Sequence, residues 1–302
     1  MAVTQIETAR RRGRPAVALR RGAAGYGFTS IYVLMLVLLG VVPAAYAIAL
    51  SVTNASGRFV GLANFLGTAR DFRFLPAFVD DLLYLLCWLP LLLVAVVGLA
   101  LLLHGKARRA SGAFRFLFYL PGALTGAASV LLWLFMLDPD VSPAVLLFSM
   151  LGQHSVNQVL APAHLPILFA VIAFWTGAGG WILVLYGALN NISIDVLEAA
   201  RMDGAGVFQT AWRIKLPMIR RTIAYMLILA FAGGSQLFVE PSMLAAATGT
   251  VSPSWSPNQL AYVFAFQQAD FNSMAAVAVD LLVIGLICAA IVVFRTGLFE
   301  VE

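Results

Sequence analysis

Three polar side chains stand inside long apolar runs, and their positions make them candidates for a functional site. Asp280 lies about seven residues, or roughly 10 Å along a helix, inside the last apolar run. Gln236 and Glu240 are one helical turn apart near the end of the preceding run, so they share a face. Polar groups at such positions are costly in energy and are functional candidates by default. They are able to hydrogen-bond a polyhydroxylated molecule, or simply to hydrogen-bond a neighbouring helix.

Three aromatic residues inside apolar runs, Trp175, Trp133 and Tyr225, are further candidates because such rings stack on sugar faces. Tryptophan and tyrosine also fill helix interfaces and membrane belts without touching a ligand, and this second interpretation is favoured. The chain contains no G-x-x-x-x-G-K-[ST] phosphate loop and no Ser/His/Asp or metal-ligand constellation. We therefore expect no ATP hydrolysis or other enzymatic activity on this chain, and no cofactor or metal.

The composition indicates that these residues belong to a membrane protein. Of 302 residues, 62% are hydrophobic and only 11% are charged, whereas a soluble domain carries roughly a quarter charged residues. A soluble fold of this size has no way to hide so much apolar surface from water. The net charge is +5, but the basic residues lie in the gaps between apolar runs. That distribution indicates membrane topology and gives no reason to expect nucleic-acid binding.

The elements that position the candidate residues are predicted to be six transmembrane helices, each near the length of about 20 residues that crosses a bilayer. The expected fold class is therefore an all-α integral membrane protein. A basic N-terminal arm over residues 1–27 precedes a six-helix domain over residues 28–302. A short apolar piece at 144–151 is too brief to span. The predicted spans cover residues 28–50, 79–103, 115–137, 164–189, 219–240 and 273–294.

The distribution of lysine and arginine predicts the orientation of these spans. With a cytoplasmic N-terminus, the cytoplasmic segments hold 16 basic residues and the external segments hold three. Six of the 16 are arginines of the N-terminal arm, which is also placed to touch anionic membrane lipid. Because cytoplasmic loops are enriched in basic residues, both termini are expected in the cytoplasm.

One predicted cytoplasmic loop, residues 190–218, is polar but regularly patterned. Ser193 or Asp195 is able to cap a short helix, and Gly204 is suited to end that helix in the left-handed conformation. A second short helix is expected over residues 207–215, before the fifth span opens. The loop is thus predicted to form a compact helix–turn–helix at the cytoplasmic face.

The loop contains a fixed spacing of residues: Glu198, Ala199, Ala200, Asp203, Gly204, Ile214, Leu216 and Pro217. This spacing resembles the EAA loop of permease subunits in binding-protein-dependent ABC importers. Asp203 beside Gly204 is similar to the form found in the carbohydrate-uptake branch of the family. Shorter resemblances at residues 59–65, 114–121 and 258–264 extend the similarity along most of the chain.

The resemblance implies the fold of a type I ABC importer permease, with the loop seated on an ATPase subunit. It also implies a second permease subunit, ATP-binding subunits and an extracytoplasmic solute-binding protein as partners, in a bacterial or archaeal cell membrane. On this interpretation, the path of a sugar or related polyhydroxylated solute is lined by Gln236, Glu240, Asp280, Trp175 and Tyr225. The alternative is a membrane-embedded enzyme acting on lipid, which would need catalytic polar residues clustered at one membrane face.

Overall fold

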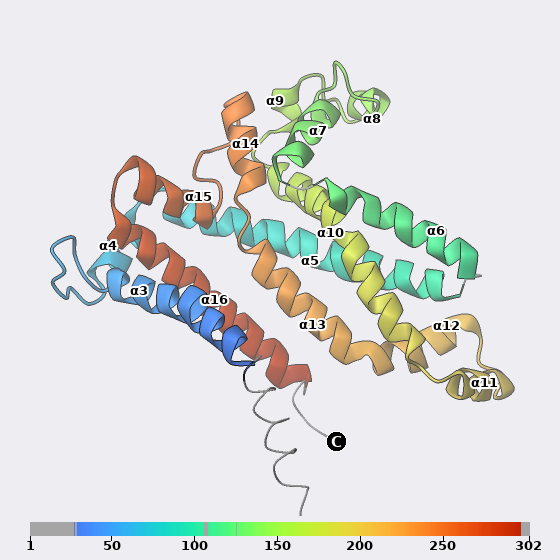
Figure 1. Ribbon diagram of the computed structural model, residues 1–302. Helices are drawn as coiled ribbons and strands as arrows, with labels where there is room; N and C mark the ends of the chain where they lie inside the picture. Colours follow the sequence, from blue (N-terminus) through green and yellow to red (C-terminus); the bar gives the residue numbers. More distant parts are fainter. Residues whose placement is uncertain (1–26, 28, 106–107, 125, 297–302) are drawn as a thin grey trace, which may run out of the picture.

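The computed structural model describes residues 27, 29–105, 108–124 and 126–296, and these residues are mostly helical (Figure 1). Five helices are long and apolar enough to cross a membrane, and counting one bent helix pair as a single span gives six. This confirms the predicted all-α membrane fold. The arginines of the N-terminal arm and Lys106 lie outside the described residues. The spans are Thr29–Ser51, Phe74–His104, Leu165–Asn190, Val207–Thr248 and Phe271–Arg295, with Ser111–Ala123 and Ala127–Leu137 as the bent pair.

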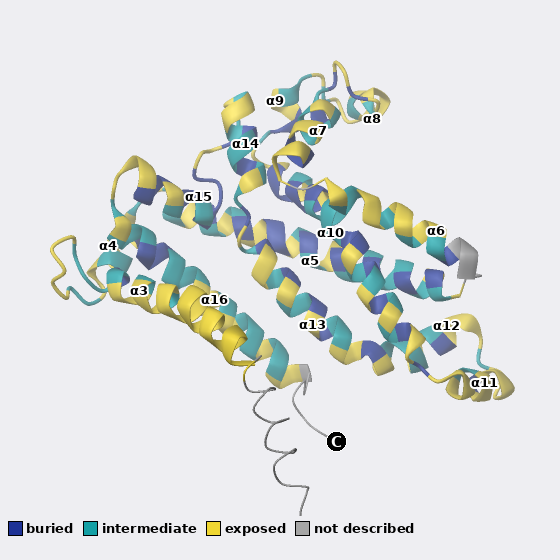
Figure 2. Cartoon of the chain, in the orientation of Figure 1, coloured by how far each residue is buried: buried dark blue, intermediate teal, exposed yellow. Residues whose placement is uncertain are grey.

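The centre of the fold is the packing of α5 (Phe74–His104) against α10 (Leu165–Asn190). Both helices are apolar along their length, as expected of spans that face protein on one side and lipid on another. Leu92 of α5 and Ile182 and Leu185 of α10 are at most 1% exposed and belong to the main cluster of buried side chains. Buried residues follow these two helices in Figure 2, while the first span is exposed along most of its length.

The third span is bent by 99°, although the sequence predicts a single run over residues 115–137. Pro121 lies in the last turn before the bend, where it lacks the backbone donor of a regular helix. Gly126 (φ +62°) then takes a backbone conformation that other residues rarely adopt. The elements of this span are α6 (Arg108–Tyr119), η2 (Leu120–Ala123) and α7 (Ala127–Leu137).

The fifth span is longer than the predicted residues 219–240, because the helix of the cytoplasmic loop continues into it. A π turn joins the loop to the span where the sequence suggests a separate helix. The span is interrupted once more after Gly234, so its external part forms a distinct helix. Its segments are α12 (Val207–Thr210), η3 (Ala211–Lys215), α13 (Leu216–Gly234) and α14 (Val239–Thr248).

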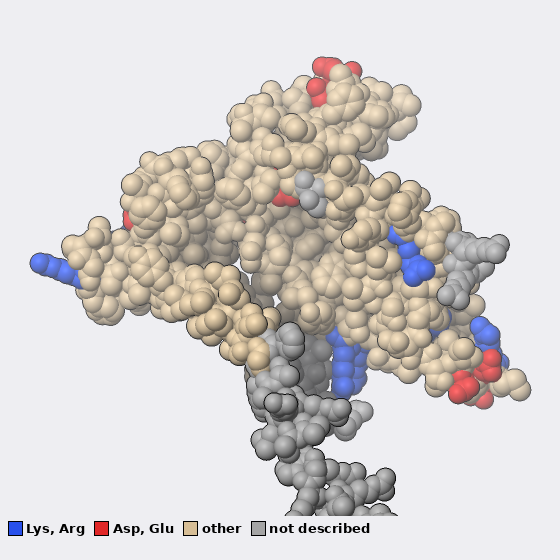
Figure 3. Space-filling model, in the orientation of Figure 1, with Lys and Arg blue, Asp and Glu red and all other residues tan. Residues whose placement is uncertain are grey.

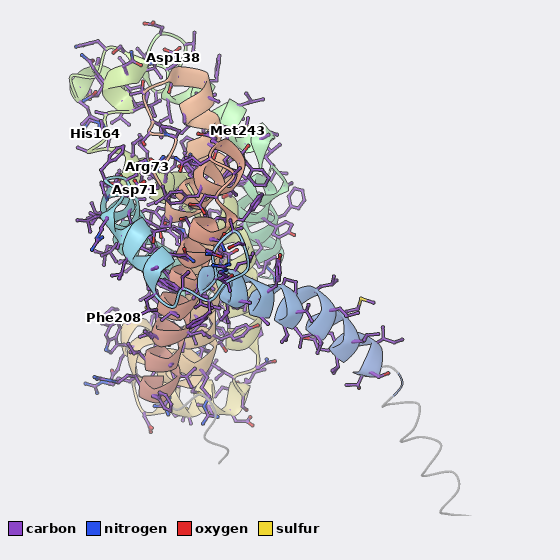
Figure 4. The ribbon with its side chains drawn as sticks, turned by 90° about the vertical axis from the view of Figure 1, so that its left-hand side faces the viewer. Asp71, Arg73, Asp138, His164, Phe208 and Met243 are labelled. Atoms are coloured by element: carbon purple, nitrogen blue, oxygen red, sulfur yellow. The ribbon has the colours of Figure 1, made fainter. Side chains whose placement is uncertain are left out.

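The first span, which ends in α3 (Val42–Ser51), packs against the last span, α16 (Phe271–Thr296). The side-chain amide of Asn272 on α16 donates hydrogen bonds to the carbonyl oxygens of Leu50 at 3.0 Å and Thr53 at 2.7 Å. Seen from the side, the rest of the first span diverges from the other helices (Figure 4). The contact between the two spans is therefore fixed at their external ends.

Short helices cover the external ends of the spans, at the top and left of Figure 1. The apolar piece at 144–151 forms one of them, as its length predicts. These helices are α4 (Ala63–Arg70), α8 (Val145–Met150), α9 (Val156–Val159), α15 (Pro257–Tyr262) and η4 (Val263–Gln267).

Candidate coupling loop and solute path

The cytoplasmic loop begins with α11 (Ile194–Met202), whose first turn is capped by Ser193. The hydroxyl of Ser193 accepts a hydrogen bond of 3.2 Å from the backbone N–H of Asp195, and such caps stabilise a helix by about 1 kcal/mol. Glu198 is exposed, whereas Ala200 is 6% exposed. The helix therefore packs one face on this chain and leaves the other accessible at the cytoplasmic surface.

Gly204 ends α11, as the sequence predicts. Its φ of +78° is the left-handed conformation that favours glycine. The turn satisfies the last carbonyl groups of the helix, since the N–H of Ala205 donates to Ala200 at 2.9 Å and that of Asp203 to Ala199 at 3.0 Å. The turn is thus fixed by backbone geometry.

The loop joins the fifth span without a flexible connection. Ile214 lies in the π turn, and Leu216 and Pro217 are the first residues of α13. A proline inside a helix clashes with the carbonyl one turn earlier, and a π turn is a common way to absorb such a disturbance. Ile214 and Leu216 are half-buried and Pro217 is exposed. The loop and α13 therefore form one continuous helical stretch.

Exposed apolar side chains of the loop form a surface that the sequence analysis did not select. Phe208 and Trp212 stack with ring centroids 6.3 Å apart, and they are 80% and 65% exposed. Met202 and Val207 beside them are exposed to a similar degree. Large apolar groups gathered on a surface mark an interaction site. The signal in the sequence was the presence of these residues in a loop too polar to span.

An open cavity of about 440 Å³ lies between α13, α15 and α16. Its polar lining residues are Ser235, Gln236 and Asn258, while Phe231 and other apolar residues form the rest of the wall. A few polar groups in an apolar concave wall are typical of a site for a small solute. Gln236 was selected from the sequence for this role. Ser235 and Asn258 were not, because nothing in the sequence indicates that α13 and α15 meet here.

The two carboxylates selected from the sequence lie outside the lining of this cavity. Glu240 is half-buried in the first turn of α14. Asp280 is half-buried on α16, and it lies about 200° around that helix from Ala278, which does line the cavity. The structure thus brings Gln236 to the cavity and places Asp280 on another face of the last span.

The aromatic candidates occupy two different environments. Trp175 packs edge-on against Trp133, with ring centroids 5.7 Å apart and an interplanar angle of 89°. This contact agrees with a role in helix packing. Tyr225 is 54% exposed on α13. Within the described part of the chain, no group of three or more His, Cys, Asp or Glu side chains is placed to hold a metal ion.

An ion pair fixes the external entrance to α5. The guanidinium of Arg73 donates two hydrogen bonds to the carboxylate of Asp71, from Nη2 at 2.7 Å and from Nε at 2.9 Å. These side-chain hydrogen bonds lower the pKa of Asp71 below its ordinary value, and they raise the pKa of Arg73. Arg73 also lies over the ring of Phe264 in η4, 5.3 Å from its centroid. The pair, labelled in Figure 4, therefore links the entrance of α5 to the segment before α16.

Comparison with known proteins decides which family has this architecture. Residues 17–296 match the model of the binding-protein-dependent transport system inner membrane component family. The chain belongs to this family of permeases. The permease is 26% identical over 280 residues to the arabinooligosaccharides transport system permease protein AraP of Halalkalibacterium halodurans, which covers 91% of this chain and 88% of AraP. It is 30% identical over 241 residues to the sn-glycerol-3-phosphate transport system permease protein UgpA of Yersinia pestis bv. Antiqua, covering 76% and 78% of the two chains.

A solved structure of a bacterial ABC transporter involved in the import of the acidic polysaccharide alginate has the same fold. The TM-score is 0.77 at 18% identity, over 95% of the permease and 100% of the other chain. The permease therefore has the type I importer fold and is a multi-pass protein of the cell membrane. It is a transport subunit of an ABC importer that works with a solute-binding protein, and not an enzyme.

Proposed function

We propose that the permease forms half of the translocation path for a sugar or a related polyhydroxylated solute, and that its loop at residues 190–218 couples this path to an ATP-binding subunit. A second permease subunit would complete the path. Three similar transporters support the solute class, because they are named for arabinooligosaccharides, glycerol-3-phosphate and the polysaccharide alginate.

The observation that carries the coupling role is the continuity of the loop with α13. The exposed pair Phe208 and Trp212 offers an apolar surface to a partner, and the helix that carries it continues into the span. When the ATP-binding subunits close, the loop would move with them and α13 would follow as a rigid body. Because α13 forms one wall of the solute cavity, this movement would change access to the site.

The same cavity supplies groups suited to a polyhydroxylated solute. The side chains of Ser235, Gln236 and Asn258 both donate and accept hydrogen bonds, as sugar hydroxyls do. Of the aromatic candidates, Tyr225 is the better placed to stack on a sugar ring, because it is exposed on α13. Trp175 is held in its contact with Trp133. Glu240 and Asp280 lie outside the lining of this cavity, and we keep them as candidates for another part of the path.

Co-purification of an ATP-binding subunit tests the coupling role. Valine in place of Gly204 forces a β-branched residue into the left-handed conformation, so the turn should open and the partner should be lost. Valine at Gly206 is the matched control, because a Cβ there meets nothing within 4 Å and its φ of −68° suits any residue. The two variants should insert equally, and only Gly204→Val should lose the partner. Equal retention by both variants would refute a coupling role for this turn.

The alternative of a membrane-embedded enzyme is not favoured. The relatives that match most of this chain are transport permeases. If the wild-type permease brought down no ATP-binding subunit while remaining folded, this alternative would need to be tested next.

A further inference from the structure

A second hollow in the membrane region differs from the polar cavity, because its wall is made of apolar side chains. This apolar hollow has a volume of about 310 Å³ and lies between α5, α13 and α16. Pro90 of α5 is exposed at the hollow and has no backbone N–H to donate. The last span contributes the small side chains of Cys288 and Ala289, which leave the space open. The hollow adjoins the polar cavity, since Phe231 and Ala289 line both.

A sugar is unsuited to the apolar hollow. Its wall offers no polar side chain, so the hydroxyl groups of a sugar would lose their hydration without gaining hydrogen bonds. An acyl chain has no hydrogen bonds to lose, and it gains dispersion contacts with the wall. The chemistry of the hollow therefore favours a hydrocarbon chain.

The depth of the apolar hollow agrees with that of the chains of the cytoplasmic leaflet. Leu227 lies seven residues, or about 10 Å, along α13 from Arg220. Val292 lies three residues, or about 5 Å, along α16 from Arg295. One leaflet contributes about 15 Å of hydrocarbon, half of the bilayer core. A lipid with its headgroup at these arginines thus has its chains at the level of the hollow.

The arginines also lie on the helix faces that line the apolar hollow. A separation of seven residues turns an α-helix through nearly two full turns, with a residual of about 20°. Arg220 therefore points in nearly the same direction as Leu227, and Arg295 in nearly the same direction as Cys288. Arg221 stands in the same relation to Ile228. The basic groups are thus aligned with the hollow from two different helices.

A basic surface lies at the cytoplasmic end of the two helices. An open hollow of about 340 Å³ at this level is lined by Pro217, Met218, Arg220 and Arg221. Figure 3 shows blue side chains gathered at the lower edge of the molecule, between the ends of α13 and α16. Basic pockets between transmembrane helices on the cytoplasmic side are suited to anionic lipid headgroups.

The described carboxylates do not neutralise this surface. Arg220 and Arg295 are exposed, and neither forms an ion pair with a carboxylate in the described part of the chain. The described carboxylates of the cytoplasmic side are on α11 and its turn, at Asp195, Glu198 and Asp203. In Figure 3 the red side chains at the lower right are apart from the blue group between α13 and α16. The positive charge is therefore available to an anion.

We propose that the permease binds an anionic phospholipid of the cytoplasmic leaflet, with an acyl chain in the apolar hollow and the headgroup phosphate on Arg220 and Arg295. The hollow selects for a chain, and the arginines select for an anion, because a guanidinium binds phosphate with two hydrogen bonds. The lipid joins α13, which continues into the loop at residues 190–218, to the last span. The inference does not depend on which solute is transported.

The test measures lipid binding to the complete purified importer, with its second permease and ATP-binding subunits. Phosphatidylglycerol or phosphatidylcholine with identical chains is added in detergent, and bound lipid is counted by native mass spectrometry. We expect one site per copy of this permease with about tenfold or higher preference for phosphatidylglycerol, since each basic residue contributes about 1 kcal/mol to binding of anionic lipid.

Charge variants test the headgroup contact. Arg220→Gln with Arg295→Gln should lower the affinity for phosphatidylglycerol about tenfold or more, to the level of phosphatidylcholine. Arg58→Gln with Arg70→Gln is the matched control, because it removes the same charge from two exposed residues of the external side. The control should stay within about twofold of wild type. Arg220→Lys with Arg295→Lys should retain the preference, which guards against misfolding as the explanation.

A second pair of variants tests the chain contact. Cys288→Phe fills the apolar hollow and keeps both arginines, so it should lower the affinity for both lipids several-fold. Ile287→Phe is the control, because Ile287 is 53% exposed and does not line the hollow. It should leave the affinity for both lipids unchanged.

Three results would overturn the inference. The first is equal affinity for the two lipids in wild type. The second is the same loss of affinity in the control arginine pair as in Arg220→Gln with Arg295→Gln, which would show that only total charge matters. The third is release of the second permease by Cys288→Phe with an unchanged number of bound lipids, which would mean that the second permease covers the hollow.

Discussion

The ammonium group of Lys215 lies 2.9 Å from Nδ1 of His104. Since an ammonium only donates, Nδ1 is the acceptor and the ring carries its proton on the other nitrogen. Lys215 ends the π turn before α13, and His104 ends α5. The ring of His104 also meets that of Tyr186 at 6.3 Å, and Arg115 lies over Tyr186 at 4.2 Å. The proposed coupling loop, residues 190–218, is thus joined to α5, α10 and α6 at one point.

His104→Leu should uncouple ATP hydrolysis from uptake, because it removes the acceptor of Lys215 and leaves its charge unpaired. We expect uptake per ATP hydrolysed to fall several-fold in proteoliposomes. His104→Asn places an oxygen near the position of Nδ1 and should restore most of the coupling. If both variants transported like wild type, the hydrogen bond would have no part in coupling.

The close approach of α10 to the third span should depend on a single glycine. A Cβ at Gly179 would overlap the carbonyl oxygen of Phe118, whereas a Cβ at Gly180 meets nothing within 4 Å. Gly179→Ala should therefore lower the midpoint of thermal unfolding in detergent by several degrees. Gly180→Ala should leave the midpoint unchanged or raise it slightly, since alanine favours helix by about 1 kcal/mol. Equal midpoints for the two variants would show that the helices separate at no cost.

The number and order of the spans were predictable from the sequence, because the length of an apolar run directly reflects the thickness of the bilayer. The turn at Gly204 was predictable for a similar reason, since a left-handed cap depends on one local residue type. The 99° bend of the third span was not. Proline at Pro121 is compatible with either a kink or a break, and neighbouring helices decide between them.

The cavity that we propose as the solute site was only partly predictable, because it is made by segments distant in the sequence. Gln236 was identified from its place in an apolar run, whereas Asn258 reaches the same cavity from a helix outside the predicted spans. The buried carboxylate of Asp81 was not singled out, because the predicted second span begins at residue 79, while the helix begins at Phe74. Because the predicted start is five residues too late, it places Asp81 at the membrane edge, whereas the residue lies about 10 Å inside the helix.

The external entrance of α5 should become less stable in acid. Because the hydrogen bonds from Arg73 lower the pKa of Asp71, the folded state favours the ionised carboxylate. This stabilisation is fully present above the unfolded pKa of about 3.9 and is lost as the pH falls through the lower folded value. In wild type, the midpoint of thermal unfolding in detergent should decline below about pH 4. Asp71→Asn should be less stable at neutral pH and should lack this component, and parallel pH profiles would contradict the prediction.

The contact between the first and last spans should depend on Asn272. Its side-chain amide donates hydrogen bonds to the carbonyl oxygens of Leu50 and Thr53. The carbonyl oxygen of Thr53 also accepts a hydrogen bond from the side-chain amide of Asn64 at 2.8 Å. Asn272→Leu would remove both hydrogen bonds, each worth about 0.5–1.5 kcal/mol. Hydrogen exchange at the end of α3 should become faster by about tenfold or more, because 1.4 kcal/mol corresponds to a factor of ten. Ser273→Ala, one residue further along α16, is the control and should leave exchange unchanged. Since the first span diverges from the helices beyond this point (Figure 4), unchanged exchange in Asn272→Leu would mean that lipid or a second subunit, and not α16, holds it in place.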